Sequence, residues 1–119
     1  DIVFELFPIL DDFRNRKGGD LSGGQQQQLS IGRALTLDPK LLILDEPTEG
    51  IQPSVIKEIE NVLLRIKELS DIAVLIVEQY LEFAWRVADI YYIMAKGSII
   101  ENGSTRDVNI DSVKKHITI

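Results

Sequence analysis

The chain has 119 residues, 45% of them hydrophobic and 27% charged, with no cysteine. This composition fits one small globular domain and excludes disordered chains, disulfide-stabilised folds and thiolate metal sites, and no apolar run approaches the ~18–20 residues of a membrane-spanning helix. The formal net charge of -6 argues against a broad surface for nucleic acid or anionic lipid, because such surfaces are usually basic.

The first part of the chain indicates short helices followed by a longer one. Residues 1–20 are rich in apolar side chains, but Pro8 interrupts them and a glycine pair closes them, so we expect only short helical pieces there. Ser22 is a good N-cap, and the pattern after it predicts a helix over residues 23–37.

The middle of the chain alternates between strands and a helix. Residues 41–44 are all apolar, as expected of a strand buried on both faces, and residues 72–77 form a second such run. Between them Pro53 suits the first turn of a helix that extends through Leu69. One side of this helix should be buried, and it carries Val55, Ile59, Val62, Ile66 and Leu69.

The last third predicts a helix over residues 81–88, with Phe83 and Trp85 available for packing, and a strand over 90–95. Lys96-Gly97 supplies turn residues into 98–101, and the tail should contain a helix around 111–116. The order strand, helix, strand, helix, strand predicts an α/β fold with parallel pairing and right-handed crossovers.

The sequence Leu21-Ser22-Gly23-Gly24-Gln25 is a candidate anion site at the start of a helix. A helix start leaves backbone N–H groups unpaired and carries about half a positive charge. Glycines let an anion approach the backbone, and a serine hydroxyl adds a donor, so the segment suits a phosphate. The alternative is an ordinary capped helix after a glycine loop.

A pair of carboxylates, Asp45 and Glu46, follows the apolar run 41–44. Ligands bind at the carboxyl ends of strands in open α/β sheets. One carboxylate there can hold Mg²⁺ through water, and a second can act as a general base on an attacking water. The alternative is a solvated acidic turn. We interpret His116, the only histidine, as a plain surface residue, and Lys114-Lys115 as a solvated face.

The two motifs together resemble the ATP-binding subunits of ATP-binding-cassette (ABC) transporters. Residues 21–25 are similar to the signature motif of that family, and residues 41–45 to its Walker B strand, with Glu46 as the catalytic glutamate. The resemblance covers essentially the whole chain. It implies the C-terminal half of a P-loop NTPase (ABC ATPase) fold, in which parallel strands with crossover helices join part of the helical signature subdomain.

The resemblance divides the chain into three segments. Residues 1–37 would be the end of the helical subdomain with the signature motif and its helix. Residues 38–103 would be the core from Walker B to the switch loop, and residues 104–119 the C-terminal tail. The phosphate-loop half is missing, because no Gly-x-x-x-x-Gly-Lys-[Ser/Thr] motif occurs in the sequence.

In that family two ATP-binding domains face head to tail, and the resemblance implies ATP and Mg²⁺ as ligands. Glu46 and Gln79 would be catalytic, and Asp45 would hold Mg²⁺ through water. The residues that would bind the ATP of the partner subunit are Ser22, Gly23, Gly24 and Gln25. Gln79 stands where most members have a histidine, and since glutamine cannot carry a proton charge, its role should be orientation. In the family, the loop that matches residues 49–52 usually ends in an aspartate, and here it ends in Gln52. Without that aspartate, the resemblance does not support a role for Gln52 in communication between sites.

The implied function is ATP hydrolysis coupled to solute uptake by an importer. Residues 46–53 and 77–79 are most similar to the branched-chain amino acid and urea types. The partners would be a second ATP-binding subunit, in a homo- or heterodimer, and transmembrane permease subunits, with no nucleic acid. The location would be cytoplasmic, peripheral on the inner face of the cell membrane. Phe4 and Phe7 are candidates for the surface that docks the permease.

Two other readings stay open. ABC-type ATPases of DNA repair or translation carry the same motifs, and the fragment could be a non-catalytic interaction module. The chain opens with Asp1 and shows no signal peptide, which fits a chain cut from something longer. We expect it to be inactive alone and to expose apolar surface beside residues 72–77 and 90–95, because the family's phosphate-loop strand lies between those two.

Overall fold

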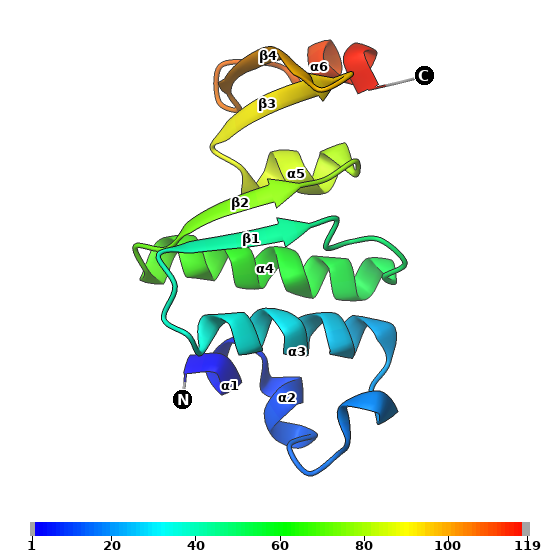
Figure 1. Ribbon diagram of the computed structural model, residues 1–119, viewed down its shortest axis with the longest axis vertical. Coiled ribbons are helices and arrows are strands. Elements are labelled where there is room, and N and C mark those ends of the chain that lie inside the picture. Colours follow the sequence, from blue (N-terminus) through cyan, green and yellow to red (C-terminus); the bar gives the residue numbers. More distant parts are fainter. Residues whose placement is uncertain (1, 118–119) are drawn as a thin grey trace. The chain divides into compact units, whose positions relative to one another are not determined.

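Two groups of elements make up the part of the chain that the computed structural model describes, which is residues 2–117; residues 1, 118 and 119 lie outside it. The first unit ends at Glu78 and the second begins at Gln79, and their helices and strands are labelled in Figure 1. This division reflects which residues pack together. The segments 1–37, 38–103 and 104–119 were inferred from sequence motifs instead, and they remain a prediction.

The first unit opens with the short helices that the sequence predicts. These are α1 (Ile2–Leu6) and α2 (Pro8–Asp12), followed by a 3₁₀ turn at Gly18–Asp20. Helix α3 (Gly23–Leu35) begins directly after its predicted N-cap, but it ends two residues before the predicted end at 37. The chain leaves the helix through Asp38, whose φ of 51° is incompatible with continuing a right-handed helix.

A strand–helix–strand crossover forms the rest of the first unit. Strands β1 (Leu41–Asp45) and β2 (Ala73–Val77) pair in parallel, from Leu41 opposite Ala73 to Asp45 opposite Val77. The connecting helix α4 (Pro53–Leu69) has the predicted bounds. Figure 1 shows α4 lying between the strand pair and α3. The parallel pairing places the carboxyl ends of β1 and β2 at one edge.

The prediction that residues 41–44 are buried on both faces is wrong. Leu42 and Leu44 are buried, whereas Leu41 and Ile43 are 51% and 60% exposed. On β2, Leu75 and Val77 are likewise exposed. Alternate strand residues point to opposite faces, so one face of the pair is covered and the other is bare apolar surface. The expected exposure of apolar surface beside residues 72–77 is therefore present.

Helix α4 buries more residues than predicted, because Ile56, Glu60 and Leu63 are also buried. Ile59, Val62 and Ile66 are buried as expected, but the last residue, Leu69, is exposed. Glu60 is only 2% exposed, and its carboxylate accepts a hydrogen bond from Lys57 Nζ at 2.9 Å. A buried carboxylate needs such a partner, because desolvation without one is costly.

The close contact between α3 and α4 depends on Gly24. A Cβ added to Gly24 would lie 2.7 Å from Val55 Cγ1, whereas a Cβ on Gly23 would meet nothing within 4 Å. Val55 is β-branched and has little rotamer freedom with which to move aside. The two adjacent glycines therefore have different roles, one in helix packing and the other in keeping the helix start open.

Replacing Gly24 by alanine should lower the free energy of unfolding by about 1–3 kcal/mol, since overpacking outweighs the better helix propensity of alanine. Gly23→Ala is the matched control and should be neutral or stabilising, because its Cβ meets open space. Urea denaturation followed by circular dichroism would measure both. Equal stabilities for the two variants would contradict the packing role.

The second unit contains α5 (Leu81–Val87), β3 (Ile90–Ala95), β4 (Ser98–Ser104) and α6 (Ile110–Ile117), which agree with the predicted positions. The predicted hairpin turn at Lys96-Gly97 is confirmed, because β3 pairs antiparallel with β4, whereas the expected parallel pairing is present between β1 and β2. Lys96 and Gly97 have φ values of 51° and 82°, the left-handed geometry of a tight hairpin turn. Within residues 2–117, β3 pairs with neither β1 nor β2.

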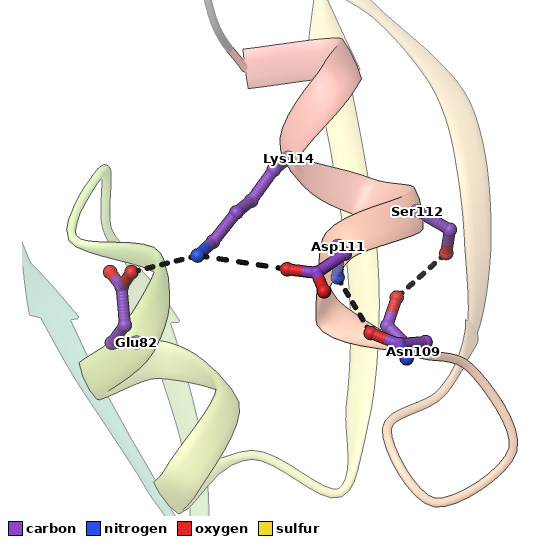
Figure 2. A network of polar contacts seen from close by, with 5 residues as sticks. All are labelled: Glu82, Asn109, Asp111, Ser112 and Lys114. Atoms are coloured by element: carbon purple, nitrogen blue, oxygen red, sulfur yellow. Dashed lines mark hydrogen bonds and ion pairs between the residues drawn. The ribbon is translucent and has the colours of Figure 1, made fainter.

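Polar contacts fix the start of α6 and link it to α5 (Figure 2). Asn109 Oδ1 accepts a hydrogen bond from the Asp111 amide at 2.9 Å, and Ser112 Oγ donates to the Asn109 carbonyl at 2.7 Å. Lys114 Nζ lies 3.1 Å from Glu82 Oε1. Lys114 is therefore more than the solvated residue we expected, although an ion pair this exposed contributes little to stability.

Candidate functional site

Ser22 and Gln25 close the start of α3 with a reciprocal capping box. Ser22 Oγ accepts a hydrogen bond from the Gln25 amide at 3.2 Å, and Gln25 Oε1 accepts one from the Ser22 amide at 3.0 Å. Both interactions are local, so the sequence alone determines where the helix begins. The expected helix start is confirmed; that the same residues bind a nucleotide remains a prediction.

The start of α3 is open to solvent. Ser22 and Gly23 are exposed, and the first amides of a helix have no partner within it. The Gln25 amide already donates to Ser22 Oγ, so an anion would approach the amides that precede it. Gly24 differs, since its missing Cβ makes room for Val55 rather than for a ligand.

Asp45 and Glu46 lie at the carboxyl edge of the strand pair, as predicted. Asp45 is the last residue of β1 and is exposed. The Glu46 amide donates to the Val77 carbonyl at 2.7 Å, which continues the pairing with β2 by one residue. Glu46 itself has φ 48°, a left-handed conformation that costs a non-glycine residue roughly 1–3 kcal/mol. The backbone therefore turns sharply at this residue.

Several acids surround the Glu46 carboxyl. A hydrogen bond and charge repulsion from Glu49, with some desolvation and the charges of Asp45 and Glu78, raise the pKa of Glu46 above its ordinary value. A raised pKa makes a carboxylate a better proton acceptor, which suits a general base. Sequence reasoning predicted the pair Asp45-Glu46 but missed Glu49 and Glu78 as its neighbours.

The loop after Glu46 is tied to the residue after β2. Glu78 Oε2 accepts hydrogen bonds from Thr48 Oγ1 at 2.8 Å and from the Thr48 amide at 3.3 Å. Pro47 and Thr48 are buried and Glu78 is half-buried, so these bonds are partly shielded from solvent. The two residues lie thirty positions apart. The signal that could have found them is that both follow strands whose carboxyl ends share an edge.

Gln79 and Gln52 are both exposed. Gln79 follows Glu78 in the chain and belongs to the second unit, so its prediction as a catalytic residue stays untested. Gln52 is the N-cap residue of α4 and makes no side-chain capping bond.

His116 has a partner that we did not predict. Its Nε2 lies 3.3 Å from Glu101 Oε1, and Tyr91 Oη donates to Glu101 Oε2 at 3.0 Å. The histidine therefore ties α6 to the β3–β4 hairpin. The pKa of Tyr91 is raised, mainly by burial. The hydrogen bond to Glu101 and the negative charge of Glu101 raise it further.

The side chains that the structure describes do not form a complete metal site. Within residues 2–117, no group of three or more His, Cys, Asp or Glu residues is arranged to hold an ion. An ion at Asp45 would take its remaining ligands from water and substrate oxygens, as Mg²⁺ commonly does. In the same range, no helix has the length and apolarity needed to traverse a bilayer.

Comparisons of sequence and of structure both find ATP-binding proteins of ABC transporters. Residues 3–49 match the family model described as ABC transporter. The high-affinity branched-chain amino acid transport ATP-binding protein BraG of Pseudomonas aeruginosa is 41% identical over 100 residues, covering 84% of this chain and 42% of BraG. The methionine import ATP-binding protein MetN 1 of Oceanobacillus iheyensis is 38% identical over 106 residues, covering 89% of this chain and 31% of that protein.

The phosphate import ATP-binding protein PstB of Pyrobaculum aerophilum is 39% identical over 109 residues, covering 89% of this chain and 43% of PstB. Among solved structures, an ATP-binding cassette of an ABC transporter superposes with a TM-score of 0.82 at 34% identity, over 98% of this chain and 48% of the other. The chain thus spans less than half the length of the relatives that it matches.

Proposed function

This chain is part of the ATP-binding cassette of an ABC transporter, and we propose that its complete protein is the ATP-hydrolysing subunit of an importer. The observation that carries the proposal is Glu46, a strained residue among acids that directly follows Asp45 at the carboxyl edge of β1. The open start of α3 at Ser22, in the same unit as Glu46, supports the proposal, because its backbone N–H groups can donate hydrogen bonds to a phosphate.

Each candidate residue then has a distinct role. Glu46 would accept the proton of the water that attacks the γ-phosphate, and Gln79 would orient that water or the phosphate through its amide. Asp45 would hold Mg²⁺ through water, and the ion would supply positive charge to the phosphate oxygens. The segment of Ser22, Gly23, Gly24 and Gln25 would contact the ATP held by a partner subunit.

The role assigned to Ser22 requires a dimer. Its segment would complete a nucleotide site in a second ATP-binding subunit, identical or not, and closure around two ATP molecules would drive attached permease subunits. Phosphate release from Mg-ATP by the complete protein tests this function directly. A purified complete protein that releases no phosphate, alone or with its permease, would overturn it.

For the solute, we favour a branched-chain amino acid or urea. The identity to BraG and the sequence of residues 46–53 support this choice, although methionine and phosphate importers match at similar identity. Uptake of labelled leucine, urea, methionine and phosphate by the complete transporter would separate the four. Uptake of only methionine or phosphate would overturn the choice.

The 119-residue chain alone should bind ATP far more weakly than the complete protein. The groups that it offers for nucleotide binding are the start of α3 and a few carboxylates. The sequence contains no phosphate-loop lysine and no loop of backbone amides that would offset the charge of the phosphates. Isothermal titration calorimetry with Mg-ATP should therefore show no binding at micromolar concentrations. A dissociation constant of about 1–10 μM, which corresponds to roughly 7–8 kcal/mol, would contradict this expectation.

A further inference from the structure

We propose that Glu78 is a positioning residue for ATP hydrolysis, because its carboxylate anchors the loop after β1 and thereby holds Glu46 in its working conformation. This inference rests on the proposed function. It concerns a residue that touches neither the nucleotide nor the attacking water in the roles assigned above.

The anchor is a pair of hydrogen bonds to one buried residue. Glu78 Oε2 accepts from both the hydroxyl and the amide of Thr48, at 2.8 and 3.3 Å. Thr48 is 6% exposed, and neighbouring Pro47 is also buried. Hydrogen bonds to a charged acceptor are stronger than neutral ones, and the partial burial of this pair reduces the competition from water. The loop is therefore fixed two residues after Glu46.

The same strand end fixes the other side of Glu46. The Glu46 amide donates to the carbonyl of Val77 at 2.7 Å, and Val77 immediately precedes Glu78. Glu46 thus lies between two attachments to consecutive residues at the end of β2. A left-handed φ of 48° in a non-glycine residue persists only when its surroundings impose it. Removing the Thr48 anchor would leave the bond to Val77 and the local turn bond from the Glu49 amide to the Glu46 carbonyl at 3.2 Å, and would free the loop to shift relative to β2.

A direct catalytic role for Glu78 fits the structure less well. Its Oε2 atom is already an acceptor for two donors of Thr48, whereas a general base needs an oxygen directed at water. Glu78 therefore acts through Thr48 and the loop. Small displacements of a reacting group reduce turnover strongly, so the expected signature is a loss in kcat rather than in substrate binding.

The test compares four single variants and one double variant of the complete protein. Glu78→Ala and Thr48→Val should each lower kcat by about tenfold to a hundredfold, with the KM for ATP changed by less than about twofold. Glu78→Gln retains an acceptor oxygen and should recover most of the lost kcat. Glu68→Ala is the control, since Glu68 lies exposed on α4, and it should match the parent. Melting temperatures of all these variants would show whether each is folded.

The double variant Thr48→Val/Glu78→Ala should be no slower than Glu78→Ala, because the hydroxyl bond that Thr48→Val removes is already lost in Glu78→Ala. Additive losses would overturn the proposal, as would a normal kcat in folded Glu78→Ala or Thr48→Val. Failure of Glu78→Gln to recover activity would also overturn it. If the parent hydrolyses ATP and depends on Glu46 while Glu78→Ala stays active, only this inference fails. If the parent does not hydrolyse ATP, the proposed function fails first.

Discussion

Replacing Glu46 by glutamine in the complete protein should reduce ATP turnover by a factor of about 10²–10⁴ while leaving ATP binding intact. Glutamine has nearly the same shape and can still hydrogen-bond to water, but it cannot take a proton from it. The substitution also removes one negative charge from a crowded group that includes Asp45, Glu49 and Glu78, so the fold should not be weakened. Phosphate release at saturating Mg-ATP measures the effect.

Glu68→Gln is the matched control, because it makes the same chemical change at an exposed site on α4. Its turnover should equal that of the parent. Since hydrolysis would reopen the dimer, Glu46→Gln should also accumulate an ATP-dependent dimer, which light scattering can detect. Parent-like turnover in Glu46→Gln would remove this residue from the mechanism.

Ser22→Arg should abolish ATP-dependent dimerisation at ATP concentrations that saturate the parent. The arginine side chain would occupy the open space before the helix start, where the proposed phosphate of the partner has to approach. It also removes the acceptor for the Gln25 amide, a loss that costs the helix about 1 kcal/mol. Light scattering with and without ATP measures the dimer.

Ser22→Ala separates the two effects, because it loses the same capping acceptor without adding bulk or charge. This variant should dimerise more weakly than the parent, and Ser22→Arg should not dimerise at all. Dimers of normal strength in Ser22→Arg would place the nucleotide contact elsewhere.

Features encoded by nearby residues could be predicted from the sequence. Ser22 and Gln25 are three positions apart and cap the same helix, Pro53 begins α4, and Lys96-Gly97 supports a hairpin turn. In each case the physical cause lies within a few residues of its effect.

Features that depend on distant contacts could not be predicted. Residues 41–44 are apolar throughout, but which of them are covered depends on what packs against each face. Thr48 and Glu78 lie thirty positions apart, and although both follow strands that end at the same edge, nothing in either local sequence specifies the bond between them. The left-handed conformation of Glu46 is likewise imposed by its surroundings rather than by its own preference.

The bare face of the β1–β2 pair has a practical consequence for handling the chain. Leu41, Ile43, Leu75 and Val77 form a contiguous apolar surface on short strands of high β-propensity. Such surfaces attract copies of themselves and promote aggregation as concentration rises. Expression of these 119 residues by themselves should therefore yield inclusion bodies or oligomers unless a detergent, a solubility tag or a covering polypeptide shields these side chains.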